Sequence, residues 1–283
     1  MSTPVYEQTP GAWDSASTAY GNMMRKTSFT RMYALDCLDK TIPVGSVKSD
    51  LLILDVAAGT GALSIPAAER VKNHNGRVIA TDFAPEMINF LNQEVKANAT
   101  PIPIETKVMD GQNLEFPDNT FDFTYSVFGL IFFPDQLRGF REMLRVLKPG
   151  GKATITSWSE NSPMGIIVRE TIAKLYKDRP DLTPPTPPQT VISLSDPVRF
   201  ESYFKECGFK NVTITPVNHT MTSTIPENIT FSLGNPIIEN IRMRLPDDLR
   251  EKFNTVYAEV LAEKYPSGEV VIDATAFVGV GEK

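Results

Sequence analysis

Cysteine and histidine are scarce in this chain, since the 283 residues include two of each. The cysteines, Cys37 and Cys207, are far apart in the sequence and fit no spacing of metal ligands. We therefore expect no metal site, and we expect both thiols to behave as small buried or half-buried side chains. The histidines, His74 and His219, limit the choice of a general base, because one of them falls in a predicted surface connection.

Long apolar runs and long basic runs are absent as well. No stretch approaches the roughly 20 consecutive apolar residues that cross a bilayer. The first residues lack the basic start and apolar run of a secretory signal, so we expect a cytosolic protein without a membrane span. The net charge is −6, which is unfavourable for neutralising phosphates. We expect no nucleic-acid partner, a small-molecule substrate, and a monomer or homodimer.

The sequence does contain a regular alternation of short apolar runs with helical patterns. Such alternation indicates an α/β fold whose parallel sheet is covered on both faces. In this region the predicted strands are 51–56, 77–81, 102–109, 121–127 and 152–158, and the predicted helices are 62–71, 86–97 and the segment that Asp135 caps.

The flanking regions are less regular. Before the alternation we predict one helix over 15–40, and after it helices at 163–177, 196–207 and across 227–265, with strands at 212–217 and 270–281. We expect one domain, 1–283, with a ligand-binding core at 50–158. The segments expected to cover the strand ends are an N-terminal helical cap, 1–45, and two later cap segments, 159–195 and 222–268.

The strongest local signal is the turn between the first strand and the first helix of the alternation. Gly59 and Gly61 would let the backbone turn tightly and approach a ligand at the carboxyl edge of the sheet. A tight turn without a ligand is one alternative, and a dinucleotide site is another, because Gly59-x-Gly61-x-x-Ser64 nearly matches that fingerprint. Asp55 and Asp110 argue against the dinucleotide, since an acidic rim repels a pyrophosphate and suits a zwitterionic sulfonium.

Several segments in register give this turn a specific context. Asp55-Val-Ala-Ala-Gly-Thr-Gly61 resembles motif I of the class I S-adenosylmethionine-dependent methyltransferases, with Ala57 in place of the first glycine, as in the quinone-methyltransferase branch. The later motifs of the family are matched by residues 78–87, 108–114, 121–126 and 145–151. The resemblance is specific over 50–158. It implies a Rossmann-like, seven-stranded, mostly parallel sheet with a reversed last strand and helical cap insertions.

The resemblance also implies S-adenosylmethionine as cofactor and assigns roles to individual residues. The glycines would bring the backbone against the methionine part, and Asp55 would help to order that loop and receive the amino group. Asp82 would hold the ribose hydroxyls, and Asp110 the adenine amino group. The full set that it implies for cofactor binding is Asp55, Ala57, Gly59, Gly61, Asp82, Phe83, Met87, Asp110, Gly111, Gln112 and Ser126.

The implied reaction is methyl transfer to a small, hydrophobic or aromatic acceptor, assisted mainly by positioning. His219 is the one candidate for a base, because the segment after the fourth strand is aromatic where many relatives have a histidine. That missing histidine keeps two alternatives open: a relative that catalyses a rearrangement or cyclisation, and a non-catalytic binding module. The residues expected to line the substrate pocket are Trp13, Tyr20, Phe128 and Trp158.

Overall fold

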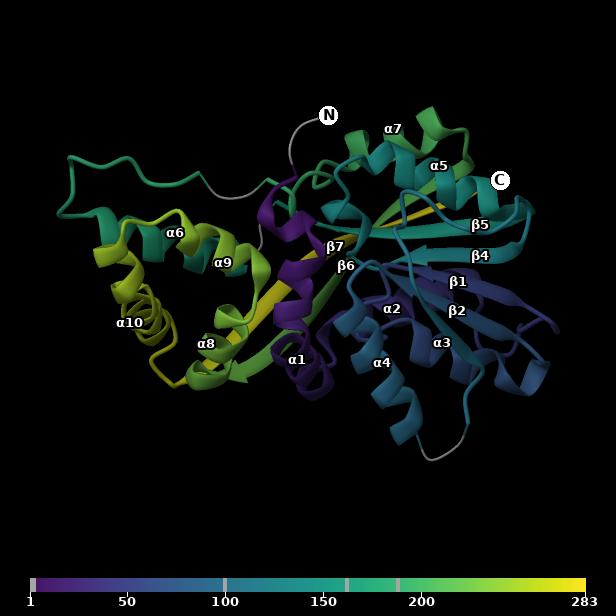
Figure 1. Ribbon diagram of the computed structural model, residues 1–283, viewed down its shortest axis with the longest axis horizontal. Helices are drawn as coiled ribbons and strands as arrows, with labels where there is room; N and C mark the ends of the chain where they lie inside the picture. The colour runs from purple at the N-terminus through teal and green to yellow at the C-terminus, as the bar shows by residue number, and fades with distance from the viewer. Residues whose placement is uncertain (1–3, 99–100, 161–162, 187–188) are drawn as a thin grey trace.

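A seven-stranded sheet forms the centre of the computed structural model, which describes residues 4–98, 101–160, 163–186 and 189–283 (Figure 1). The strand order is β3-β2-β1-β4-β5-β7-β6. The first five strands pair in parallel, and β7 runs antiparallel to both β5 and β6, which confirms the predicted fold class. The strands are β1 (Leu52–Val56), β2 (Arg77–Asp82), β3 (Ile104–Val108), β4 (Phe121–Ser126), β5 (Leu147–Trp158), β6 (Lys210–Thr224) and β7 (Glu269–Glu282).

Helices cover both faces of this sheet, with α2, α3 and α4 on one side and α5 and α7 on the other (Figure 1). Their bounds are α1 (Pro10–Thr27), α2 (Phe29–Thr41), α3 (Ser64–Val71), α4 (Pro85–Ala97), α5 (Gln136–Val146), α6 (Pro163–Tyr176), α7 (Pro197–Cys207), α8 (Ile225–Leu233), α9 (Pro236–Met243) and α10 (Asp247–Lys264). Short 3₁₀ turns are η1 (Tyr6–Gln8), η2 (Lys72–His74) and η3 (Leu130–Phe132).

The hydrophobic core forms where the apolar faces of these helices pack against the sheet. On one side Leu38 and Val71 are fully buried against β1, and on the other the rings of Phe140 and Phe204 meet edge to face at 4.9 Å. The predicted cap of α5 is confirmed, because Asp135 Oδ1 accepts the N–H of Arg138 at 2.9 Å. A parallel sheet buried on both faces explains why its strands read as continuous apolar runs.

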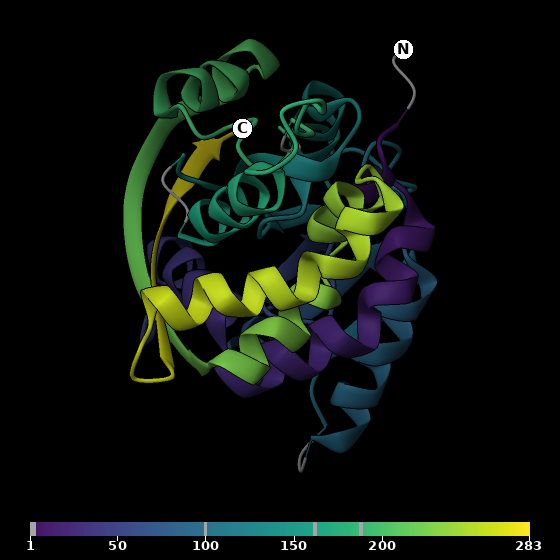
Figure 2. The same ribbon diagram turned by 90° about the vertical axis from the view of Figure 1, so that its left-hand side faces the viewer.

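β6 is longer than the predicted strand 212–217, whereas β7 begins and ends within one residue of the predicted 270–281. The two strands form an antiparallel ribbon whose outer half, from Asn218↔Thr275 to Thr224↔Glu269, extends past the pairing of β7 with β5. The helices α6, α8, α9 and α10 gather on this extension as a cap (Figure 2). Three ion pairs, Lys174–Glu263 at 2.7 Å, Lys174–Glu259 at 3.0 Å and Lys264–Glu170 at 2.8 Å, join α6 to α10.

The single N-terminal helix predicted over 15–40 is wrong, because the chain breaks at Ser28, which has the left-handed φ of 53°. The two halves have different roles. The first, α1, lies alongside α4 in both views and is joined to it by the ion pair between Arg25 and Glu94. The second, α2, packs its buried residues Ala34 and Leu38 into the core under the sheet. The two helices of the segment 1–45 thus lie in different places, α1 along α4 and α2 against the core.

Two further sequence expectations concern features of the whole chain. Within the described ranges, no helix has both the length and the apolar character that a membrane span requires. The same ranges contain no group of three or more His, Cys, Asp or Glu side chains that could hold a metal ion.

Candidate cofactor and acceptor site

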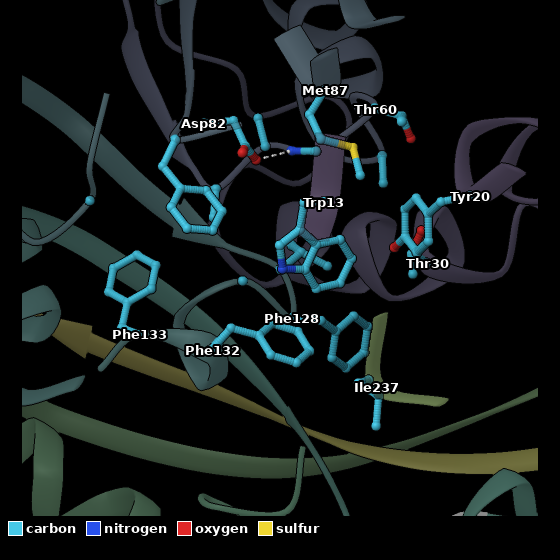
Figure 3. Close-up of a pocket in the computed structure, with 18 of the residues that line it drawn as sticks. Trp13, Tyr20, Thr30, Thr60, Asp82, Met87, Phe128, Phe132, Phe133 and Ile237 are labelled. Carbon is cyan, nitrogen blue, oxygen red and sulfur yellow. Dashed lines mark hydrogen bonds between the residues drawn. The ribbon is translucent and has the colours of Figure 1, made fainter. Parts of the chain in front are cut away.

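A cavity of about 740 Å³ opens at the carboxyl ends of β1, β2 and β4, where open α/β sheets bind ligands (Figure 3). The core supplies its floor, through the loop after β1 and the segments after β2, β3 and β4. The roof comes from α1, from Val191 and from the cap residues Phe231, Asn235 and Ile237. A volume of this size lies within the range of roughly 300–1,000 Å³ that small-molecule sites occupy.

The loop after β1 is held in a conformation that suits close approach of a ligand. Ala57, Gly59 and Gly61 all have positive φ, at 57°, 54° and 93°. Gly59 faces open space, since a Cβ built there would meet no atom within 4 Å, whereas one built at Gly61 would meet Leu91 at 2.4 Å. Gly59 therefore offers bare backbone to the cavity, while Gly61 is needed for packing against α4.

Asp82 ties this loop to the end of β2. Its Oδ2 accepts the N–H of Gly59 at 2.8 Å, shown dashed in Figure 3, and its Oδ1 accepts the N–H of Ala84 at 2.9 Å. Burial raises the pKa of Asp82 to about 6, against the lowering effect of these two hydrogen bonds. Because a carboxylate has about four acceptor positions, Asp82 keeps capacity for two hydroxyl donors on a ligand in the cavity.

Asp55 supports the same loop through a hydrogen bond at the start of α3. Its Oδ2 accepts the hydroxyl of Ser64 at 2.5 Å, which fixes the start of α3, and burial raises its pKa to about 7. Asp55 does not line the cavity, so the structure supports the loop-ordering part of its predicted role and not a direct ligand contact.

The segment after β3 forms the rim of the cavity. Asp110 Oδ1 accepts the N–H of Gln112 at 2.8 Å, and Gln112 Oε1 in turn accepts the N–H of Asp135 at 2.8 Å. These bonds hold the predicted adenine segment against the start of α5, with Gly111 packed under the ring of Phe133. Asp110 is exposed at this rim. Its second oxygen, Oδ2, accepts the side-chain amide of Gln112 at 3.3 Å and has a further acceptor position for a ligand amino group.

The charge of the cavity separates the two cofactor alternatives. Among the described residues, its lining includes Asp82, Asp110 and Glu115 and no Lys, Arg or His. Such a lining favours a cationic ligand and lacks the positive groups that usually neutralise a diphosphate. Bare backbone at Gly59 and a buried carboxylate at the end of β2 would serve a ribose-bearing cofactor of either kind. The acidic rim, in a lining without positive side chains among the described residues, is the feature that favours S-adenosylmethionine over a dinucleotide.

The other end of the cavity is apolar and aromatic. The ring of Phe128 stacks on Trp158 with centroids 3.8 Å apart and planes 3° apart, and Phe29 stacks at 5.6 Å and 11° from Trp158. Tyr33 meets all three rings edge to face and donates its hydroxyl to the carbonyl of Ala274 at 2.5 Å. The stack thus forms a rigid wall, in agreement with the prediction that Phe128 and Trp158 face this space.

Trp13 and Tyr20 of α1 also line the cavity, as predicted. Figure 3 shows Trp13 between the end with Asp82 and Met87 and the end with Phe128. Its indole N–H donates to the carbonyl of Glu7 at 2.8 Å. Burial raises the pKa of Tyr20 to about 12, so its phenol stays protonated at neutral pH and serves as a donor.

Three other predicted residues lie outside the lining. Gly61 is covered by α4. Ser126 is fully buried, and its Oγ accepts the N–H of Leu130 at 3.0 Å, so it shapes the turn after β4. His219 pairs with Asp36 at 2.6 Å and packs edge-on against Tyr33, away from the cavity. The position of His219 does not support the role of a base.

Further lining residues were not predicted, although some stood out as apolar positions. Met24 and Phe29 belong to the apolar face of the N-terminal helical pattern, which was a signal for packing and not for a site. The cap residues are distant from the core in the sequence and contact it only in the folded chain, so no local pattern predicts that they line the cavity. The additional lining residues on both sides of the acceptor end are Met24, Phe29, Thr30, Phe132, Phe133, Met164, Val191, Met221, Phe231, Asn235, Ile237 and Ile272.

Fold and site together define a Rossmann-like protein that holds a cationic, ribose-bearing cofactor beside a second, apolar compartment. Comparison with known proteins agrees with this class. Residues 53–151 match the family model of the methyltransferase domain. A demethylmenaquinone methyltransferase of Lactobacillus johnsonii is 30% identical over 179 residues, covering 61% of this chain and 73% of that protein. The chain belongs to the class I S-adenosylmethionine-dependent methyltransferases, whose cofactor is S-adenosylmethionine.

Two further comparisons give another similar sequence and a solved structure with the same fold. An uncharacterized protein of Mycobacterium tuberculosis is 29% identical over 199 residues, or 68% of this chain. The match covers 65% of that protein, so the chain spans just under two thirds of its length. The crystal structure of the YcgJ protein from Bacillus subtilis shares the fold with a TM-score of 0.57 at 16% identity, covering 89% of this chain and 98% of that one.

Proposed function

We propose that this protein transfers a methyl group from S-adenosylmethionine to a small acceptor with an apolar or aromatic body. One observation carries the proposal: a single cavity connects the cofactor residues at the ends of β1 and β2 with the aromatic wall of Phe128 and Trp158. A demethylmenaquinone methyltransferase among the relatives acts, by its name, on an acceptor of this kind.

The bound cofactor would supply a methyl group on a positively charged sulfur, which is its own leaving group. In this proposal Asp82 holds the ribose hydroxyls, Gly59 offers backbone to the methionine part, and Asp110 receives the adenine amino group. Phe83 and Met87 line the same end of the cavity and pack on the adenine.

In this proposal the protein accelerates the transfer by positioning the acceptor and by excluding water. The described lining has no histidine or lysine that could act as a base, and the phenol of Tyr20 stays protonated. Its three carboxylates, Asp82, Asp110 and Glu115, come from the end of β2 and the segment after β3, which hold the cofactor in this proposal, so none of them is assigned to remove a proton from the acceptor. Acceptors that lose their proton readily, or have none to lose, are therefore favoured. The apolar wall orients such an acceptor and keeps water from the cationic centre.

Acceptor screening by mass tests the proposal. The protein is incubated with S-adenosylmethionine and a panel of phenols, naphthols, quinols and aromatic amines, and Asp82→Asn serves as the matched control. The proposal predicts a product heavier by one CH₂ unit, together with S-adenosylhomocysteine in equal amount. Consumption of an acceptor without that mass gain would favour the rearrangement alternative. Cofactor binding without any turnover would favour a binding module.

The expectations of a cytosolic location, of a monomer or homodimer, and of no nucleic-acid partner remain predictions from the sequence.

A further inference from the structure

At Ala57 and Gly129 the residue types do not match the backbone conformations that these positions adopt. Ala57 has a φ of 57°, in the left-handed region that favours glycine, whereas Gly129 has φ −91° and ψ −48°, which any residue adopts. A Cβ built on Gly129 would lie 2.4 Å from the Cβ of Ala57, and 3.1 Å from both the carbonyl oxygen of Ala57 and Ser126 Oγ. The contact with the Ala57 methyl group is the one too short to be accommodated without a shift. The methyl group therefore stands at the strained position and glycine at the relaxed one, because only one of the two can fill the space.

This contact lies where the two halves of the cavity meet. Ala57 opens the cofactor loop, and Gly129 directly follows Phe128, whose ring belongs to the acceptor wall; all three residues line the cavity. Hydrogen bonds fix the turn on both sides of Gly129. The N–H of Phe128 donates to Thr156 Oγ1 at 2.8 Å, and Ser126 Oγ receives the N–H of Leu130.

Phe128 itself needs an external constraint. Its φ of 58° is unfavourable for a bulky side chain, so the turn would relax if its surroundings allowed. The ring is nevertheless held flat on Trp158 at 3.8 Å. The methyl group of Ala57 is the packing contact that meets the turn from the cofactor side.

We propose that Ala57 is a positioning residue whose methyl group, pressed against Gly129, fixes the ring of Phe128 at the boundary between the cofactor and acceptor compartments. Glycine at position 57 would relieve the strained backbone and leave a gap of one methyl group beside the turn. The inference rests on the proposed function for its consequence, which is selection of a flat acceptor, but its structural part can be tested without turnover.

The test uses Trp158 as a reporter, in a Trp13→Phe background that leaves it as the only indole, since the chain has two tryptophans. Near-ultraviolet circular dichroism reports the stack of Trp158 on Phe128. Ala57→Gly is expected to reduce that signal by at least half and to weaken binding of 2-naphthol, a flat apolar probe, at least fivefold. The dissociation constant of S-adenosylhomocysteine is measured on the same variant, and binding of 2-naphthol should weaken by a larger factor than binding of S-adenosylhomocysteine, because a general loss of stability would weaken both alike.

A second pair of variants tests the shared space. Gly129→Ala should lower the melting temperature by several degrees, and adding Ala57→Gly to it should recover at least half of that loss. An unchanged Trp158 signal in Ala57→Gly overturns the proposal, as does an equal loss from Gly129→Ala in both backgrounds. If Gly129→Ala does not fold, recovery of folding in the double variant supports the shared space, and failure of the double variant overturns it.

Failure of the proposed function has a different signature. Absence of S-adenosylhomocysteine binding in the parent protein would contradict the cofactor assignment, and absence of 2-naphthol binding would contradict the acceptor class. In either case the Trp158 signal and the melting temperatures still decide whether Ala57 positions Phe128.

Discussion

The residues that carry this site differ in how directly the sequence identified them. Asp82 and Gly59 were assigned by resemblance to family motifs, and the structure joins them by a hydrogen bond of 2.8 Å at the mouth of the cavity. Asp55 belongs to the same motif, yet it lies beneath the loop and bonds Ser64. A motif marks residues that build a loop as well as residues that touch a ligand, and only the three-dimensional position separates the two roles.

Asp82→Asn should weaken the binding of S-adenosylhomocysteine by about 1–3 kcal/mol, because the amide loses the charge and one acceptor group that the ribose hydroxyls need. Calorimetric titration measures this loss. Asp273→Asn is the matched control, since Asp273 lies on β7 and bonds Thr220 outside the cavity. Equal affinity in the parent and a folded Asp82→Asn variant would contradict the assigned role of Asp82.

The pH dependence of stability should reveal the buried Asp55. Its pKa is about 7 in the folded protein because of burial, against an ordinary value of 3.8. Between about pH 4 and 7 the folded state thus retains a proton that the unfolded chain has lost, so the free energy of unfolding falls as the pH rises. Asp82, with its pKa raised to about 6, acts in the same direction.

Asp55→Asn keeps an acceptor for the hydroxyl of Ser64 but cannot titrate. The stability of the parent relative to this variant should therefore fall by roughly 1–3 kcal/mol between pH 5 and pH 8. Urea unfolding at four pH values measures the difference, with Asp118→Asn at an exposed position as control. Parallel stability curves for the parent and Asp55→Asn would show that Asp55 is ionised across this range.

At the scale of elements, the alternating core could be predicted because each strand and helix follows a local apolar pattern. β2 and α4, for example, begin and end within a residue or two of the predicted bounds. β6 was predicted only over 212–217, because beyond Val217 its residues are mostly polar and lie on an exposed edge. Pairing with β7 in the ribbon extends it to Thr224, and such long-range pairing leaves no local pattern.

The cap is joined to the N-terminal segment by one buried carboxylate. Glu7 has no exposed surface, and its side chain accepts the hydroxyl of Thr190 at 2.8 Å and the amide N–H of Asn240. It connects η1, the segment around residue 190 and α9, each of which is next to residues that roof the cavity. Removing it would leave two polar groups without their partner, at about 1–3 kcal/mol for each one that water does not reach.

Glu7→Ala should therefore loosen the roof without changing the floor. We expect S-adenosylhomocysteine to dissociate several-fold faster, and amide hydrogens of residues 5–20 to exchange faster, while β1 and β2 keep their protection. Stopped-flow dissociation and hydrogen exchange measure the two effects. Glu251→Ala, at an exposed position of α10, is the control. Uniformly faster exchange over the whole chain would instead indicate a general loss of stability.

At the scale of the whole molecule, each of the two parts of the fold builds one compartment of the cavity. The core supplies an acidic, backbone-lined compartment, and the ribbon of β6 and β7 carries a cap that completes an apolar one. The core compartment could be derived from motifs in register over about a hundred residues, whereas the cap side depends on segments that meet only after folding. This is why the cofactor and the rings of Phe128 and Trp158 were expected from the sequence, whereas the cap residues that line the acceptor end were not.

The most direct test of the central claim is calorimetric titration of the protein with S-adenosylhomocysteine and, in parallel, with NAD. The acidic lining and the free acceptor positions on Asp82 predict saturable, one-to-one binding of S-adenosylhomocysteine and no binding of NAD. Binding of NAD, or the absence of binding by S-adenosylhomocysteine, would contradict the assignment of this cavity as a methyltransferase site.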